Sequence, residues 1–314
     1  MQPRASARAA RAGIIAACFA LGAWAAWPAL AQATNEHDHA IPAPVDDTQP
    51  PAFASRAITL APHITELVYA AGAGDKIVGT VTSSDYPPQA RHIPRIGDGL
   101  NINVEHAISL QPEVVIAWLA HGAAPTLAPA LSTLDIPLIF SRPGKLSDIP
   151  AEILRFGRLF NTQTPAMAMA QALTRRLDAL GARYAGQKTV SVFIEVGTSP
   201  LYTLGKSPLI NDALRLCGGV NVYANANIAA PQASVESVLV KRPDVVITPA
   251  RGEAAQEEAR LRWAAVHLPA ALNGHVYAVD PDKLFRPGPR LIDATEQLCQ
   301  QLELARQAPS GPDR

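Results

Sequence analysis

Side chains able to contact a ligand follow several short apolar runs, at the points where we expect β-strands to end. In a doubly wound α/β fold, the loops beyond the carboxyl ends of the strands gather on one side of the sheet, where ligands bind. Aromatic and charged residues in such loops suit a large, partly apolar ligand. The candidate binding residues are His63, Asp85, Tyr86, Trp118, His121, Tyr202, Asp282, Phe285 and Arg286.

These candidates also have purely structural interpretations. Trp118 could cover the end of a sheet, Asp282 could pair with Arg286, and His121 could be an ordinary surface histidine. Spacing alone does not decide between the two interpretations.

Signatures of common enzymes are missing from the sequence. There is no Gly-x-Ser-x-Gly and no His-Glu-x-x-His, and Gly205-Lys206-Ser207 has Pro200 where a phosphate-binding loop needs glycine. The Cys and His spacings do not make a zinc site. We therefore expect a binding protein rather than an enzyme, with no cofactor of its own.

The charge balance excludes some classes of partner. Lys and Arg number 27 and Asp and Glu number 27, so nothing indicates a nucleic-acid or acidic-membrane partner. The 314 residues are enough for one or two domains with a sizeable core.

The first 33 residues have the pattern of a secretory leader. Arginines come first, and the stretch from Ile14 to Ala31 has no charge. Small-x-small patterns predict cleavage after Ala33 or after Ala31. A lipoprotein box ending at Cys18 and an uncleaved membrane anchor stay open as alternatives. We expect export to the periplasm.

Export changes the interpretation of the cysteines. Cys217 and Cys299 are the two cysteines after the leader, and an even pair in an oxidising compartment indicates a disulfide. The alternative is two buried free thiols.

A helix-strand unit occurs twice at a constant offset of 131 residues. Val104 to Ile116 and Val235 to Ile247 each read as a short helix, a proline, an acidic residue and a Val-Val-Ile strand. Asn103 and Ser234 are suitable N-caps, which places Glu105 and Glu236 in first helical turns. The helix dipole alone favours glutamate there, but the duplication predicts two similar lobes.

Strands alternating with helices predict a parallel sheet in each lobe. The helix from Pro165 to about Ala185 is about 30 Å long, which suits a rigid connection. We thus expect an α/β fold of two Rossmann-like lobes, joined by one long rigid helix, with a ligand cleft between the lobes. The expected segments are a leader (1–33), a flexible linker (34–55), an N-terminal lobe (56–146), connecting helices (147–187), a C-terminal lobe (188–308) and a tail (309–314).

From Arg56 to Leu304 the chain resembles the long-helix class of periplasmic solute-binding proteins of ABC importers, and most of all its cobalamin-binding (corrinoid-binding) branch. Ser84-Asp85-Tyr86-Pro87-Pro88 and both cysteines point to that branch. The resemblance is also carried by Ile58 to Pro62, Thr65-Glu66-Leu67, Asn103-Val104-Glu105, Pro112 to Trp118, Gly205-Lys206, Cys217 to Asn221, Pro231 to Glu236, Pro289-Arg290 and Gln297-Leu298-Cys299.

This resemblance implies roles for individual residues. Glu105 and Glu236 match glutamates that dock on a permease dimer in the inner membrane, and Cys217 and Cys299 match a disulfide. The chain would act as a monomer that delivers cobalamin or a related corrinoid. The resemblance implies ligand contacts at Trp118, in the Asp282–Arg286 loop and at the position of Ser83. With the residues of the loops after the strands, the expected ligand-binding set is Ser83, Asp85, Tyr86, Trp118, His121, Asp282, Leu284, Phe285 and Arg286.

The sequence departs from the family where that branch has aromatic residues. Ser83 stands in place of a tyrosine, and Gly99 and Ala230 stand in place of tryptophans. The same scaffold could therefore carry haem or an iron-siderophore complex instead. In that case His63 and His121 would be candidate axial ligands.

Overall fold

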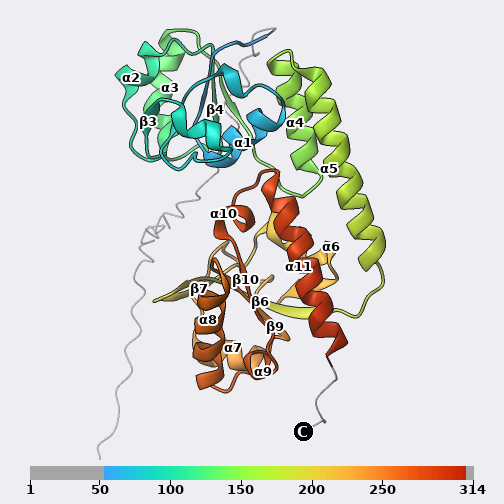
Figure 1. Cartoon of the computed structure of the whole chain (residues 1–314). Coiled ribbons are helices and arrows are strands. Elements are labelled where there is room, and N and C mark those ends of the chain that lie inside the picture. Colours follow the sequence, from blue (N-terminus) through green and yellow to red (C-terminus); the bar gives the residue numbers. More distant parts are fainter. Residues whose placement is uncertain (1–52, 309–314) are drawn as a thin grey trace, which may run out of the picture. The chain divides into compact units, whose positions relative to one another are not determined.

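The computed structural model describes residues 53–308, which form two α/β lobes and two connecting helices (Figure 1). The N-terminal lobe contains a parallel sheet in the order β3-β2-β1-β4-β5, so the first strand lies in the middle. Its strands are β1 (Ala57–Thr59), β2 (Ile77–Val81), β3 (Arg95–Gly97), β4 (Val114–Ala117) and β5 (Leu138–Phe140).

Helices cover both faces of this sheet because β1, β4 and β5 have apolar residues on both sides. The lobe's α-helices are α1 (Pro62–Ala70), α2 (Val104–Ser109) and α3 (Ala123–Thr133), with 3-10 turns at Gly74–Lys76 and Pro88–His92. Pro62 stands in the first turn of α1, where its missing N–H costs no helical hydrogen bond.

Two helices connect the lobes and pack against each other: α4 (Asp148–Leu159) and α5 (Gln163–Tyr184). The 22 residues of α5 are rich in Ala, Leu and Arg, which are strong helix formers, and extend about 33 Å. Contacts of α5 reach α1 in one lobe and α6 and α11 in the other. The long connecting helix predicted from the sequence is confirmed, beginning two residues earlier than expected.

The C-terminal lobe repeats the plan with one change. Parallel strands flank β6 on both sides, but β7 pairs with β6 antiparallel and forms a hairpin. Residues 201–203 therefore form a strand, and the sheet is mixed and not purely parallel as predicted. The strands are β6 (Val190–Thr198), β7 (Leu201–Thr203), β8 (Gly219–Asn221), β9 (Val245–Pro249) and β10 (Val276–Val279).

Six helices accompany this sheet in the described part of the chain, and three of them begin with proline in the first turn. The Asp280–Arg290 stretch contains α10 and the start of α11. The six helices are α6 (Pro208–Leu216), α7 (Val235–Lys241), α8 (Glu253–Ala265), α9 (Pro269–Leu272), α10 (Pro281–Leu284) and α11 (Arg290–Gln307).

The helices and strands of the duplicated unit begin at matching positions in the two lobes. Helices α2 and α7 begin 131 residues apart, and so do β4 and β9. Even the residue that turns the chain between helix and strand is matched, because Gln111 has φ 49° and Arg242 has φ 44°. Both expected N-caps are confirmed: Asn103 Oδ1 accepts from His106 N, and Ser234 Oγ accepts from Ser237 N.

The hydrophobic core has three parts. One covers the outer face of the N-terminal sheet and a second covers the outer face of the C-terminal sheet. The third and largest runs without interruption from α1 through α4 and α5 to α6 and α11. The connecting helices are thus part of a core that both lobes share, which stiffens the joint between them.

The start of the folded body differs from the sequence prediction. Ala54 is buried and donates its N–H to Leu159 O at the end of α4, so the chain packs against the folded body two residues before the expected start of the first lobe. The leader, Cys18 and the tail at 309–314 lie outside the described residues, as does the linker up to residue 52. Within 53–308, no helix combines the length and apolarity needed to span a bilayer.

Candidate functional site

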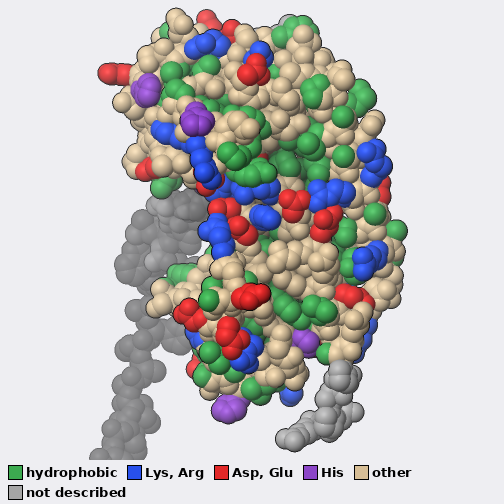
Figure 2. Space-filling model, viewed as in Figure 1, with side chains coloured by type: hydrophobic (Ala, Val, Ile, Leu, Met, Phe, Trp, Pro, Cys, Tyr) green, Lys and Arg blue, Asp and Glu red, His purple; other side chains and the backbone are tan. Residues whose placement is uncertain are grey.

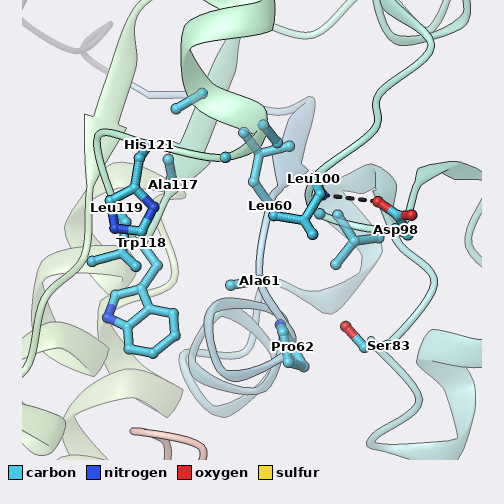
Figure 3. A pocket seen from close by; sticks show the side chains of 15 residues that line it. Leu60, Ala61, Pro62, Ser83, Asp98, Leu100, Ala117, Trp118, Leu119 and His121 are labelled. Carbon is cyan, nitrogen blue, oxygen red and sulfur yellow. Dashed lines mark hydrogen bonds between the residues drawn. The ribbon is translucent and has the colours of Figure 1, made fainter. Parts of the chain in front are cut away.

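A hollow of about 260 Å³ lies at the carboxyl ends of the N-terminal strands (Figure 3). Its walls come from Leu60 after β1, Val81 at the end of β2, Trp118 after β4, and the first residues of α3. In Figure 3, Trp118 and His121 line one side, and Ser83 and Asp98 line the other. This part of the site therefore arises where loops beyond parallel strands were expected to gather.

Trp118 is the main aromatic surface of the hollow. Its side chain is 39% exposed, and its backbone oxygen accepts from Arg142 Nε at 3.0 Å. The His63 ring packs edge-on behind it, with ring centroids 5.0 Å apart. Because a partner fixes one side of the indole while another part faces outward, Trp118 can offer a preset stacking surface.

Leu100 is a wall residue that the sequence did not single out. Asp98 Oδ1 accepts from the N–H groups of Leu100 and Asn101, which folds the loop and leaves Leu100 at the rim. At Gly99, an added Cβ would meet only Val81 Cγ1, at 4.0 Å. The space beside Gly99, where the cobalamin branch was expected to have tryptophan, is therefore open.

His63 is placed differently from the expectation. It lies in the first turn of α1, is 1% exposed, and its Nε2 has no hydrogen-bond partner within residues 53–308. Burial lowers its pKa to about 3, so the ring is neutral at ordinary pH. In this structure His63 supports Trp118 and is not accessible to a ligand, whereas His121 is exposed at the hollow's rim.

Buried hydroxyl groups hold the base of the loop that carries Asp85 and Tyr86. Thr65 Oγ1 lies 2.7 Å from Thr59 Oγ1, 3.0 Å from Thr80 Oγ1 and 3.1 Å from Ser84 Oγ. Arg95 also donates to the Ser84 backbone oxygen at 2.9 Å. A loop fixed by satisfied buried groups is presented rigidly.

Glu66 ties this lobe to the other one. It lies in α1 with a side chain only 2% exposed, and it receives two hydrogen bonds from Arg290 of α11, Nη2 to Oε1 at 2.6 Å and Nε to Oε2 at 2.9 Å. This two-pronged arginine–carboxylate geometry is the strong form of the interaction. Burial raises the pKa of Glu66, while Arg290 and Arg286 partly oppose that rise.

Arg286 makes the second link between the lobes. Its Nη1 donates to Asp85 Oδ1 at 2.7 Å and lies 3.5 Å from Glu66 Oε1, and its Nη2 lies 2.8 Å from Asp282 Oδ1. Burial would raise the pKa of Asp85, but the hydrogen bond and charge of Arg286 outweigh burial and hold it below its usual value. The alternative interpretation that Asp282 pairs with Arg286 is confirmed.

Arg251 extends this network within the C-terminal lobe. Its Nε donates to Asp280 Oδ2 at 3.0 Å, and its Nη2 pairs with Asp282 Oδ2. Figure 2 shows basic and acidic side chains crowded together across the middle of the visible face. The described C-terminal half of the site is therefore charged, and its arginines are already paired.

The structure divides the predicted ligand-binding residues into separate groups. Ser83, Trp118 and His121 share the hollow, and Asp85, Asp282 and Arg286 share the ion-pair network. Two further residues, Tyr86 and Phe285, are set apart: the Tyr86 ring lies under Arg290, 4.1 Å from its Cζ, and Phe285 packs against the core.

Leu284 and Tyr202 lie away from these groups. Leu284 is completely buried in the main core, so in this structure it presents no surface to a ligand. Tyr202 is on the exposed β7 hairpin, where its backbone pairs with Gln232.

Sequence reasoning missed Glu66, Arg290 and Arg251 as members of the site. One local signal was available for Glu66: a carboxylate inside the apolar run Ile64 to Val68 must find a partner once buried. No local pattern indicates that the partner lies 224 residues away.

Glu105 and Glu236 are exposed in the first turns of α2 and α7, as expected. Backbone and Ser234 hydrogen bonds lower the pKa of Glu236.

The predicted disulfide between Cys217 and Cys299 is confirmed, with Sγ–Sγ 1.99 Å, joining the end of α6 to α11. Within residues 53–308 there is no group of three or more His, Cys, Asp or Glu placed to hold a metal ion.

The structure has two α/β lobes on a shared helical core, and each lobe has candidate binding residues beyond the carboxyl ends of its strands. This is the architecture of a two-lobe binding protein. The family model for periplasmic binding proteins matches residues 58–283. The vitamin B12-binding protein of Vibrio cholerae serotype O1 is 36% identical over 252 residues, covering 80% of this chain and 90% of that protein. The chain belongs to the periplasmic binding protein family, which confirms the resemblance found in the sequence and the expectation of a binding protein.

Solved structures agree with this assignment. The periplasmic vitamin B12 binding protein of Vibrio cholerae superposes with a TM-score of 0.73 at 35% identity, covering 81% of this chain and 98% of that one. The periplasmic heme-binding protein of Roseiflexus sp. RS-1 gives a TM-score of 0.68 at 24% identity, covering 81% and 100%. The second similarity concerns the fold alone.

Proposed function

We propose that this chain is the periplasmic solute-binding component of an ABC importer and that it captures cobalamin or a related corrinoid. The observation that carries the proposal is the 36% identity to a vitamin B12-binding protein over 90% of that protein's length. A similarity over 252 residues extends through most of both lobes and is not limited to one of them.

The geometry is compatible with a ligand larger than the hollow. Pockets for drug-sized ligands usually measure about 300–1,000 Å³, so 260 Å³ can hold only part of a corrinoid. A corrinoid is a flat macrocycle with amide side chains at its edge. Trp118 would contact the flat face, while Arg286 and Asp282 would meet the amides.

The ligand assignment is tested by titrating the exported protein with cyanocobalamin, haemin and a ferric siderophore, followed by calorimetry and visible spectra. We expect cyanocobalamin to bind at micromolar concentration or below, and Trp118→Ala to weaken binding at least tenfold. Leu272→Ala is the control, because Leu272 is also an exposed apolar side chain but lies on α9. No binding of cyanocobalamin by the unmodified protein would refute the assignment.

Haem is the second candidate, and the exposed His121 at the rim of the hollow favours it. His121 could coordinate iron, whereas His63 is buried in this structure. If haem is the ligand, haemin will give a shifted Soret band that disappears in His121→Ala and persists in His63→Gln. A Soret band unchanged by His121→Ala would remove this candidate.

The proposed partner is the membrane permease, contacted through Glu105 and Glu236. Both side chains are exposed at matching positions of the repeated unit, where each could meet a basic residue of a permease subunit. Glu105→Ala with Glu236→Ala should abolish most transport while leaving ligand affinity unchanged. Glu253→Ala is the control for Glu236→Ala, since Glu253 is also an exposed first-turn glutamate of the same lobe. Full transport by the double variant would contradict the docking role.

Export through the leader completes the proposal. We expect the periplasmic protein to begin after Ala33, or after Ala31. Mass spectrometry of protein purified from the periplasm measures this directly. A lipid-modified Cys18 or a retained leader would replace the soluble form with an anchored one.

A further inference from the structure

The two ion pairs between the lobes differ in how easily they can be broken. Glu66 and Arg290 are joined by two hydrogen bonds, and their side chains are 2% and 13% exposed. Asp85 and Arg286 are joined by one hydrogen bond, and the Asp85 side chain is 47% exposed. Breaking the first pair would leave a buried charge without a partner, which is strongly unfavourable. A half-exposed pair contributes much less, because water solvates its charges when they separate.

Both Nη atoms of Arg286 face carboxylates in the described structure. The side chain is 13% exposed, and its partners are Glu66, Asp85 and Asp282. A ligand group that approaches either Nη atom must therefore compete with a carboxylate. Asp85 is the most exposed of the three, and it is the one that can leave without uncovering a buried charge.

Asp85 is also held in position independently of Arg286. The hydroxyl network under Ser84 and the hydrogen bond from Arg91 Nε to the Asp85 backbone oxygen, 3.1 Å, fix the loop from its own lobe. These bonds hold the backbone of the loop, so the Asp85 carboxylate can leave Arg286 by movement between the lobes or by rotation of its own side chain, without rearrangement of the loop. Gly288 also lies close to α1, because an added Cβ would be 3.5 Å from His63 Cβ, and this contact would remain with the Glu66–Arg290 pair.

We propose that Asp85 and Arg286 form a releasable latch between the lobes, with Glu66 and Arg290 as the fixed point, and that the ligand competes with Asp85 for Arg286. The proposal rests on the proposed function for the identity of the ligand, and it assigns Asp85 a positioning role in place of the predicted direct contact. The latch keeps the ligand-free lobes together and lowers ligand affinity by the strength of one half-exposed ion pair.

The test compares Asp85→Asn with Asp135→Asn, which removes the same charge from an exposed position of the same lobe. Small-angle scattering of the ligand-free proteins should give a larger radius of gyration for Asp85→Asn only. Calorimetry with cyanocobalamin should show about threefold tighter binding for Asp85→Asn, which corresponds to the loss of a competing exposed pair. Raising salt from 0.05 to 0.5 M should strengthen binding to the unmodified protein, because salt weakens its latch, and should not strengthen binding to the variant.

Opposite results would overturn the proposal. Weaker binding by Asp85→Asn would make Asp85 a direct ligand contact. An unchanged affinity, or an unchanged radius of gyration, would mean that no latch operates. If the unmodified protein does not bind cyanocobalamin at all, the proposed function fails, and the scattering comparison still decides whether the latch exists.

Discussion

The two lobes share a repeated scaffold but differ at the ends of their first strands. By strand register, Ala57 and Val192 pair with matching residues of β4 and β9, so Leu60 and Glu195 occupy equivalent positions. Leu60 lines the hollow of the N-terminal lobe. Glu195 is fully buried and accepts from Arg262 at 2.7 Å and from Trp263 Nε1 at 2.9 Å. Leu60 thus leaves an apolar surface at this position, whereas Glu195 binds Arg262 and Trp263 and so holds α8 over the equivalent position.

This difference gives the proposed ligand two unlike surfaces, one from each lobe. The N-terminal lobe offers Trp118 and aliphatic walls, whereas the C-terminal lobe offers charges that are already paired. Preorganised half-sites of unlike character suit a ligand with an apolar face and a polar edge. A symmetric duplication would have offered the same chemistry twice.

Removing the disulfide should produce the largest effect. Cys217→Ser with Cys299→Ser opens a loop of 82 residues, and the expected loss of stability is about 4–5 kcal/mol. Denaturation measures the loss, and hydrogen exchange locates it. Protection should fall most in α6 and α11 and least in α2 and α3. A uniform loss would show that the shared core makes the two lobes one cooperative unit.

Replacing Glu195 by leucine, the residue type of the equivalent Leu60, should lower the free energy of unfolding. Glu195→Leu removes the acceptor of Trp263 Nε1 and the partner of Arg262, and the expected loss is about 3 kcal/mol by denaturation. Glu195→Gln is the control, because its amide oxygen can still accept from the indole. Equal losses in both variants would indicate that charge, and not the hydrogen bond, holds α8 on the sheet.

The buried His63 should give the N-terminal lobe an acid sensitivity. Its folded pKa of about 3 lies below the ordinary value of 6.5, so the unfolded chain binds a proton that the folded chain does not. The free energy of unfolding is therefore not reduced by His63 above pH 6.5. It falls as the pH drops towards 3, and at pH 5 the reduction is about 2 kcal/mol. The stability of His63→Gln should therefore depend less on pH between 5 and 7. The comparison variant is His275→Gln in the other lobe. Burial also lowers the pKa of His275, and the charge of Asp244 opposes this effect. Identical pH profiles for His63→Gln and the unmodified protein would contradict the argument.

Helix caps should show the smallest difference between lobes. Asn103→Ala should cost about 1 kcal/mol, and Ser234→Ala up to about 2 kcal/mol, because Ser234 and Ser237 form a reciprocal capping box. Local hydrogen exchange at the starts of α2 and α7 measures each loss. A larger loss at Asn103 would show that the second bond of the box contributes nothing.

Local patterns predicted the repeated parts well and the unique parts poorly. The unit around Glu105 and Glu236 was predictable because caps, a turn and a Val-Val-Ile strand all act over a few residues. The Glu66–Arg290 pair was not, because which charges meet depends on how distant segments pack. The short helix α10 was also missed, and it is this helix that turns Leu284 into the core.

The length of α5 has a consequence for how the family can vary. Each residue of a helix adds about 1.5 Å and about 100° of rotation. Leu173 and Tyr184 are buried along this helix, and Arg176 binds Asp293 and Glu296 of α11, so the helix cannot turn freely at either end. One inserted residue would therefore twist the lobes out of phase and separate Asp85 from Arg286. We expect natural variants to differ freely in loop lengths while the residue count of α5 stays constant.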